Sequence, residues 1–213
     1  MALTKTPVCD FGKKAEDFKL KSINNKVLTL NDIKGEKATL IMFICNHCPY
    51  VKAIIKDLAK DCIELRNDGI SSVAIMSNDT KNYPEDSFDN MIKFADNNNF
   101  GSTNYLFDET QEIAKKYGAV CTPDFFGYNR NLELQYRGRF RELKDLKPIN
   151  SGESDLKIAM KMVAQTQKGP AEQIPSMGCN IMWFSLCFWF PHEIFLPSWV
   201  ECKTSWKVYP TRF

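Results

Sequence analysis

Apolar residues follow two different periods in the first half of the chain. Residues 38–44 form a continuous apolar run, which predicts a strand buried on both faces, and residues 70–76 predict a second buried strand. Between these segments, apolar residues recur every three or four positions from Val51 to Leu65, with charged residues among them. This spacing predicts an amphipathic helix that ends near Asn67. Strand, helix and strand in succession predict a βαβ unit with a parallel strand pair.

Shorter patterns predict the remaining elements. Alternation on both sides of Asn24-Asn25 predicts an N-terminal hairpin with strands at 18–21 and 27–30. Three further helices are predicted, at 87–97, from after Asp108 to 117, and at 155–165. The predicted strands are an edge strand at 105–107 and hairpin strands at 123–128 and 132–137, and a loop is predicted at 144–152. Asp108 and Gln111 have the spacing of a capping box, and Ser154 is the predicted N-cap of the last helix.

These elements predict one α/β domain over residues 1–182. Residues 183–213 differ from it, because they contain all four tryptophans and few charges. Pro191, His192 and Pro197 interrupt this apolar segment, so it does not predict a membrane span, and membrane association is not expected. The segment is interpreted either as appended or frame-shifted sequence, or as an apolar surface for a partner or a membrane.

Composition and charge limit which partners and which cellular compartment are expected. The 28 Lys and Arg residues and 26 Asp and Glu residues are scattered, which predicts no nucleic-acid partner. Residues 1–18 contain no apolar core of a signal peptide, so a cytoplasmic location is expected. The eight cysteines are irregularly spaced, and in a reducing compartment cysteine pairs are more often catalytic or metal-binding than structural.

The segment Cys45-Asn46-His47-Cys48 is the main candidate for chemistry. It follows a predicted buried strand and opens the amphipathic helix, with Pro49 in the first turn. The N–H groups and the dipole at a helix N-terminus stabilise negative charge, so a thiolate with a low pKa is predicted at Cys45. We expect Cys45 to be the exposed nucleophile and Cys48 to be the more buried thiol that resolves a mixed disulfide.

The role of His47 stays open in the sequence, and zinc binding is the main rival to redox chemistry for the cysteine pair. His47 would either tune the pair by stabilising the thiolate or lie in solvent as a loop histidine. A structural zinc site needs four ligands, and no second pair of this kind follows. Cys62 lies on the buried face of the predicted helix and is interpreted as a core residue. No metal or other cofactor is therefore expected.

A second candidate site lies at Thr122-Pro123, just before a predicted strand. The proline is either in a cis turn or an ordinary trans residue at the start of a strand. Cys121 is either an accessory redox thiol or a small buried residue. Arg137 and Arg139 are interpreted as a solvated pair on a hairpin.

Several ordered segments resemble the redoxin family of the thioredoxin fold, in the peroxiredoxin-like branch related to alkyl hydroperoxide reductase and thiol-specific antioxidant proteins. They are FICNHCPYVKA (43–53), AIMSNDTKNYPEDS (74–87), YGAVCTPDFFGYN (117–129), YRGRF (136–140) and PSMGCNI (175–181). The resemblance implies a thioredoxin-like three-layer sandwich, with a mixed central sheet flanked by helices. It also implies that Pro123 is cis and faces the cysteine pair, and that Thr122 offers backbone groups to a substrate segment.

The chain departs from this family pattern in two places. Neither Cys45 nor Cys48 completes the Pro-x-x-x-Thr-x-x-Cys pattern of a peroxidatic site. Residues 38–44 contain no Asp or Glu, although thioredoxins use a buried acid in this strand for proton transfer.

The leading hypothesis is therefore a thiol–disulfide oxidoreductase that acts on a protein or small-molecule disulfide and is recycled by a cellular thiol reductant. One alternative is a peroxiredoxin-like thiol peroxidase with a peroxide substrate. The other is a non-catalytic module that binds a metal or a thiol.

Overall fold

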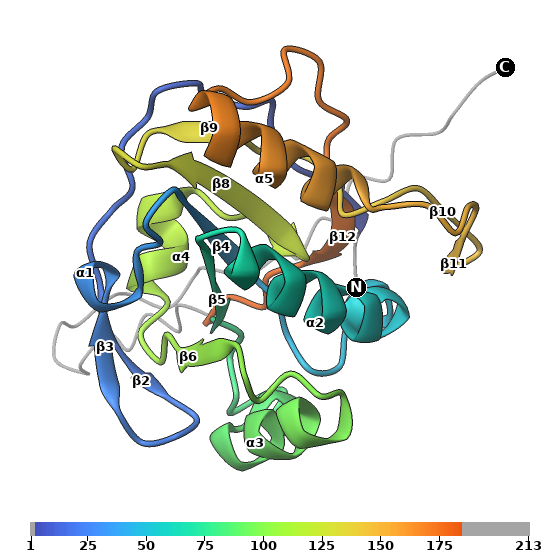
Figure 1. Cartoon of the computed structure of the whole chain (residues 1–213). Coiled ribbons are helices and arrows are strands. Elements are labelled where there is room, and N and C mark those ends of the chain that lie inside the picture. The colour runs from blue at the N-terminus through green and yellow to red at the C-terminus, as the bar shows by residue number, and fades with distance from the viewer. Residues whose placement is uncertain (1–2, 185–213) are drawn as a thin grey trace, which may run out of the picture.

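The computed structural model describes residues 3–184, and these form an α/β fold with helices on both faces of a central sheet (Figure 1). The helices are α1 (Leu30–Ile33), α2 (Pro49–Asn67), α3 (Phe88–Asn97), α4 (Glu112–Tyr117) and α5 (Asp155–Thr166), with a short 3₁₀ helix η1 (Pro84–Asp86). The strands are β1 (Leu3–Lys5), β2 (Lys19–Ser22), β3 (Val27–Thr29), β4 (Ala38–Phe43), β5 (Ile70–Met76), β6 (Asn104–Phe107), β7 (Cys121–Thr122), β8 (Asp124–Asn129), β9 (Leu134–Tyr136), β10 (Leu143–Lys144), β11 (Lys147–Pro148) and β12 (Met177–Asn180).

The central sheet has the strand order β3-β2-β6-β5-β4-β8-β9. Strand β4 is buried along its whole length and pairs in parallel with β5, with Ile41 opposite Val73. On its other side β4 pairs with β8 in antiparallel fashion, with Ile41 opposite Phe126. The sheet is therefore mixed, and the predicted βαβ unit is confirmed.

Alternate residues of the strands contact opposite helical layers. Leu40 and Met42 belong to the apolar cluster that contains the buried faces of α2, α3 and α5. Ile41 and Phe43 belong to the second cluster, with buried residues of α1 and α4. Since successive side chains of a strand point to opposite faces, this division confirms the predicted three-layer sandwich.

A second, three-stranded sheet has the order β1-β12-β7. Strand β12 is antiparallel to both neighbours, with Cys179 opposite Leu3 on one side and Thr122 on the other. This sheet brings the first described strand and the last one to the residues just before Pro123.

Three local predictions need correction. Strand β6 is not an edge strand, because β2 of the N-terminal hairpin pairs with it on its outer side. Asp108 and Gln111 do not form a capping box: Asp108 accepts the Ala114 N–H at 2.9 Å, and Gln111 has a positive φ. The predicted loop at 144–152 contains β11, which pairs with β10. The N-cap role of Ser154 is confirmed, since its side chain accepts the Lys157 N–H.

No helix among residues 3–184 is both long enough and apolar enough to cross a membrane. The predicted division at residue 182 and the interpretation of the aromatic tail concern residues that lie almost entirely outside the described ones.

Candidate active site

The cysteine pair lies at the junction of β4 and α2, as the sequence predicts. Strand β4 ends at Phe43, and Cys48 is the N-cap residue of α2, with Pro49 at its first position. The segment follows the carboxyl end of this buried inner strand. Pro49 lacks an N–H, but the N–H at the first position of a helix has no partner within the helix, so no helical hydrogen bond is lost. Both thiols therefore lie near the N-terminus of a 19-residue helix.

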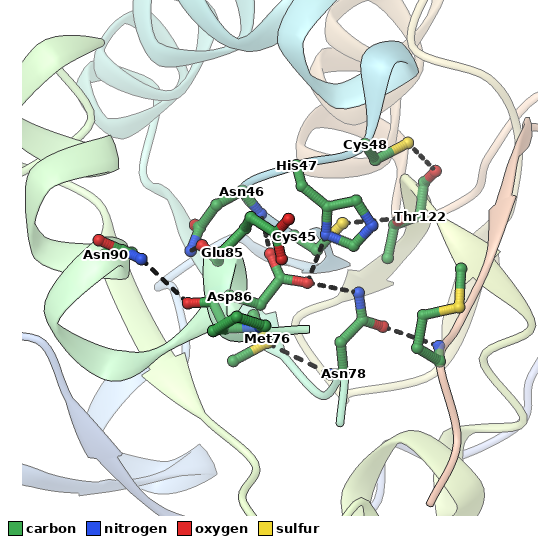
Figure 2. A network of polar contacts seen from close by, with 12 residues as sticks. Cys45, Asn46, His47, Cys48, Met76, Asn78, Glu85, Asp86, Asn90 and Thr122 are labelled. Carbon is green, nitrogen blue, oxygen red and sulfur yellow. Dashed lines mark hydrogen bonds and ion pairs between the residues drawn. The ribbon is translucent and has the colours of Figure 1, made fainter. Parts of the chain in front are cut away.

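Thr122 contacts both sulfur atoms (Figure 2). The Cys45 Sγ lies 3.3 Å from the Thr122 hydroxyl, and the Cys48 Sγ lies 3.1 Å from the Thr122 carbonyl oxygen. The Thr122–Pro123 peptide bond is cis, which confirms the implication of the family resemblance. Residues 77 positions apart in the sequence thus meet around one threonine.

The predicted difference in exposure between the two cysteines is wrong. Cys45 is 1% exposed and Cys48 is 0% exposed, so neither sulfur lies open to solvent. Cys45 is covered because its side chain points inward to Thr122, while Asn46 is held by the Asp86 carboxylate and His47 is mostly buried beside it.

The predicted site of the thiolate also needs correction. The pKa of Cys48 is lowered from 9.0 to about 5, chiefly by hydrogen bonding from the Cys45 thiol; burial opposes this shift, and the Val51 N–H in the first turn of α2 contributes to it. Hydrogen bonding with Cys48, together with burial and the nearby Asp86 carboxylate, raises the pKa of Cys45. The Thr122 carbonyl opposes the effect on Cys48, because it accepts a hydrogen bond only from the thiol form. The backbone donors at the helix end favour the anion on Cys48.

His47 is bound to a buried carboxylate rather than lying free in solvent. Its Nδ1 lies 2.7 Å from the Asp86 Oδ2, and Asp86 also accepts the Asn46 N–H and the Asn78 side-chain amide, both at 2.8 Å. The hydrogen bond with Asp86 raises the pKa of His47, which favours the positive imidazolium. The ring stacks on Tyr83, and its Nε2 is buried without a partner among the described residues.

Asp86 is the site residue that the sequence reasoning missed. The search for a buried acid was confined to the strand before Cys45, whereas Asp86 comes from η1, which follows β5. The carboxylate is 0% exposed and lies beside the cysteine pair (Figure 2). Its signal in the sequence was the acidic end of the segment at 74–87, which is one of the five that resemble the redoxin family.

Cys45, His47 and Asp86 form a cluster that could hold a metal ion. One potential ligand atom each from Cys45, His47 and Asp86 lies within 4.8 Å of the others. Structural zinc sites use four protein ligands, so this cluster would leave at least one position for water or substrate.

The backbone of Thr122 is not free for a substrate segment, contrary to the prediction. Strand β12 already pairs with β7 there, with Cys179 opposite Thr122. The Cys121 thiol contacts the Pro123 carbonyl oxygen at 3.6 Å, and burial raises its pKa well above the usual value. Its contacts agree with a small buried residue.

Arg137 is buried, not solvated. It donates to the Asp124 carboxylate at 3.0 Å and to the Gly118 carbonyl at 2.7 Å. Asp124 directly follows Pro123, so this ion pair fixes the strand that begins at the cis proline. Arg139 pairs with Asp155 at the surface.

A cavity of about 470 Å³ is lined in part by Pro123. Tyr50 and Ile54 of α2, Phe140, and the aliphatic side chains of Leu143 and Ile174 line its apolar part. It lies next to the residue that follows Thr122 and has room for part of a small substrate.

A buried dithiol at the start of a helix, in contact with the residue before a cis proline on this three-layer fold, defines a redoxin-type protein of the oxidoreductase class. The chain belongs to the AhpC/TSA family, whose sequence profile matches residues 11–140. No curated protein sequence matches it.

Two solved structures resemble the chain over nearly their whole length. An uncharacterized conserved protein from Geobacillus kaustophilus is 40% identical, with 86% of this chain and 97% of that chain covered and a TM-score of 0.78. A hypothetical protein from Sinorhizobium meliloti is 36% identical, with 85% and 99% covered and a TM-score of 0.79. The exposed lipoprotein thioredoxin of Streptococcus pneumoniae shares the fold at 19% identity, with 70% and 98% covered and a TM-score of 0.51.

Proposed function

We propose that the protein is a thiol–disulfide oxidoreductase whose redox centre is the pair Cys45 and Cys48. The observation that carries the proposal is the placement of both thiols around Thr122 at the N-terminus of α2, where Cys45 lowers the pKa of Cys48. The two sulfurs can share one proton, so the pair holds one thiol and one thiolate near neutral pH. This is the state from which dithiol exchange begins.

The exchange proceeds in two balanced steps. The Cys45 sulfur attacks one sulfur of the substrate disulfide and passes its proton to Cys48, and the other substrate sulfur leaves as a thiolate and then takes that proton. The Cys48 thiolate next attacks the Cys45 sulfur of the mixed disulfide. The second substrate thiolate leaves, and a Cys45–Cys48 disulfide remains. A cellular thiol reductant returns the pair to the dithiol form.

His47 supplies the positive charge that favours attack by Cys45, and Asp86 keeps it protonated and in position. Asp86 holds the imidazolium of His47 near the Cys45 sulfur, and a positive charge there stabilises the anion that forms during attack. Asp86 is a positioning residue in this proposal. Asp86→Asn should lower the pKa of His47, so the pH at which activity declines on the alkaline side should move to lower pH. A pH–rate profile unchanged in Asp86→Asn would contradict this role.

A small disulfide is the favoured substrate, because β12 occupies the edge of β7 that an extended protein segment would need. Reduction of glutathione disulfide and of insulin, each with a dithiol reductant, tests this preference. Cys45→Ser should abolish turnover, while Cys121→Ser, which changes a buried thiol that contacts Pro123 instead, should retain it. Wild-type turnover by Cys45→Ser would refute the proposal.

The family match favours a thiol peroxidase as the second candidate. It predicts that the reduced protein consumes hydroperoxide in stoichiometric amounts and accumulates a Cys45–Cys48 disulfide. A metal- or thiol-binding module predicts instead that purified protein carries metal at the cluster of Cys45, His47 and Asp86, which elemental analysis would detect.

The proposal includes a cytoplasmic location, where thiol reductants maintain the dithiol. The irregular spacing of the eight cysteines supports it. Cell fractionation followed by immunodetection tests it.

A further inference from the structure

A third thiol lies against the cysteine pair. Cys48 and Cys179 belong to the same buried cluster, and hydrogen bonding by the Cys179 N–H and thiol contributes to the lowered pKa of Cys48. Cys179 lies opposite Thr122 in the β7–β12 pairing, and the carbonyl of Thr122 is 3.1 Å from the Cys48 Sγ. Cys48 and Cys179 thus approach the same threonine from two different elements.

The position of Cys179 is fixed from both sides. β12 is the middle strand of its sheet, so Cys179 pairs with Leu3 as well as with Thr122. A Cβ at the preceding Gly178 would overlap the Thr122 carbonyl oxygen. The close approach of the two strands therefore requires a glycine there, and it holds the next residue, Cys179, near Cys48.

We propose that Cys179 is a third redox residue, which exchanges with the Cys45–Cys48 disulfide to form a Cys48–Cys179 disulfide. This inference rests on the proposed function, because that reaction produces the first disulfide. The Cys179 sulfur attacks the Cys48 sulfur, the Cys45–Cys48 bond breaks, and Cys45 leaves as a thiolate that takes the proton from Cys179. The disulfide is relocated without any further oxidant or reductant, and Cys45 is free to react again.

Oxidation of the pair removes one obstacle to this step. Burial raises the pKa of Cys179 to about 12 in the reduced protein, and the hydrogen bond and negative charge of Cys48 contribute to the rise. Once Cys48 is in a disulfide, its negative charge is gone and only the effect of burial remains. Cys179 is then a better nucleophile than in the reduced protein.

Cys121 is also buried, but its thiol makes a different contact. It is the neighbour of Thr122 and is as buried as Cys179, but its thiol is directed to the Pro123 carbonyl oxygen. It is therefore the matched control for Cys179.

Disulfide mapping by mass spectrometry tests the proposal on the full chain. Wild-type protein is oxidised with one equivalent of glutathione disulfide, its free thiols are alkylated, and its peptides are identified. We expect two products, a Cys45–Cys48 disulfide and a peptide cross-linked through Cys48 and Cys179. The cross-linked peptide should be lost in Cys179→Ser and retained in Cys121→Ser.

The variant Cys45→Ala separates this proposal from the proposed function. It cannot form the first disulfide, but diamide should still join Cys48 to Cys179, with the loss of two alkylatable thiols. If Cys48–Cys179 is absent from both wild type and Cys45→Ala, the inference is wrong, whatever the turnover of the wild type. If it forms in Cys45→Ala while wild type shows no disulfide turnover, the proposed function fails and the pairing of these two thiols stands.

Discussion

Removal of the Cys45 thiol is the most direct test of the electrostatics of the site. Cys45→Ala deletes the donor that chiefly lowers the pKa of Cys48, and it leaves α2 and the Val51 N–H in place. We expect the pKa of Cys48 to rise from about 5 towards the 9.0 of an unperturbed thiol. The interval between the two values corresponds to ~5 kcal/mol of thiolate stabilisation.

The change in charge at neutral pH is large. At pH 7 a thiol with a pKa of about 5 is roughly 99% ionised, whereas one with a pKa of 9.0 is roughly 1% ionised. The ultraviolet absorbance of the thiolate, followed across the pH range in reduced protein, measures this fraction, and subtraction of Cys48→Ala isolates Cys48. Cys9 and Cys62 do not interfere, because burial raises the pKa of each to about 11.

Cys45→Ser is the matched control, because its hydroxyl keeps a hydrogen-bond donor at the same position. The pKa of Cys48 should be lower in Cys45→Ser than in Cys45→Ala. A Cys48 that titrates near 9 in the wild type would show that the Thr122 carbonyl outweighs the donors. A pKa that stays near 5 in Cys45→Ala would show that Cys45 is not the cause.

Two further substitutions probe the surroundings of the cis proline. Arg137→Met leaves the buried Asp124 without its partner and should reduce the free energy of unfolding by about 3–5 kcal/mol, measured by urea denaturation. Burial raises the pKa of Asp124 to about 6 even with Arg137 present, so the loss should be smaller below pH 6, where the carboxyl is protonated, and larger above it. Gly178→Ala places a methyl group against the Thr122 carbonyl and should cost about 1–3 kcal/mol, with loss of the Cys48–Cys179 disulfide in the mapping experiment.

Each substitution has a control in the same chain. Arg130→Met changes an exposed arginine and should leave stability within about 0.5 kcal/mol of wild type. Gly152→Ala adds a methyl group whose nearest neighbour is 3.9 Å away, and it should be tolerated. If a test variant and its control lost the same free energy of unfolding, the loss could not be attributed to the buried ion pair or to the close contact between the strands.

Local sequence patterns were sufficient for the elements that carry the cysteine pair. The apolar run at 38–44 and the helical spacing from Val51 to Leu65 depend only on neighbouring residues, and both elements formed where predicted. The family segments added the cis Thr122–Pro123 bond, which the residues alone left open.

The errors concern contacts between residues far apart in the sequence. Exposure of Cys45 depends on Thr122, 77 positions later, and the acid beside His47 is Asp86, 39 positions later. The position of Cys179 depends on a pairing with Thr122 that no local pattern encodes. Strand β12 also carries the short segment MGCN, which has too little alternation to predict a strand.

Strand β12 comes late in the sequence, so the site is incomplete while the chain is being synthesised. A growing chain that has emerged as far as β8 already contains Cys45, Cys48 and Pro123, but not the strand that lies across Thr122. Until residues 177–180 dock between β1 and β7, the Thr122 backbone lacks its partner strand and Cys48 lacks its neighbour Cys179. This side of the site is therefore completed by one of the last described segments, and it depends on the first described strand being in place to receive it.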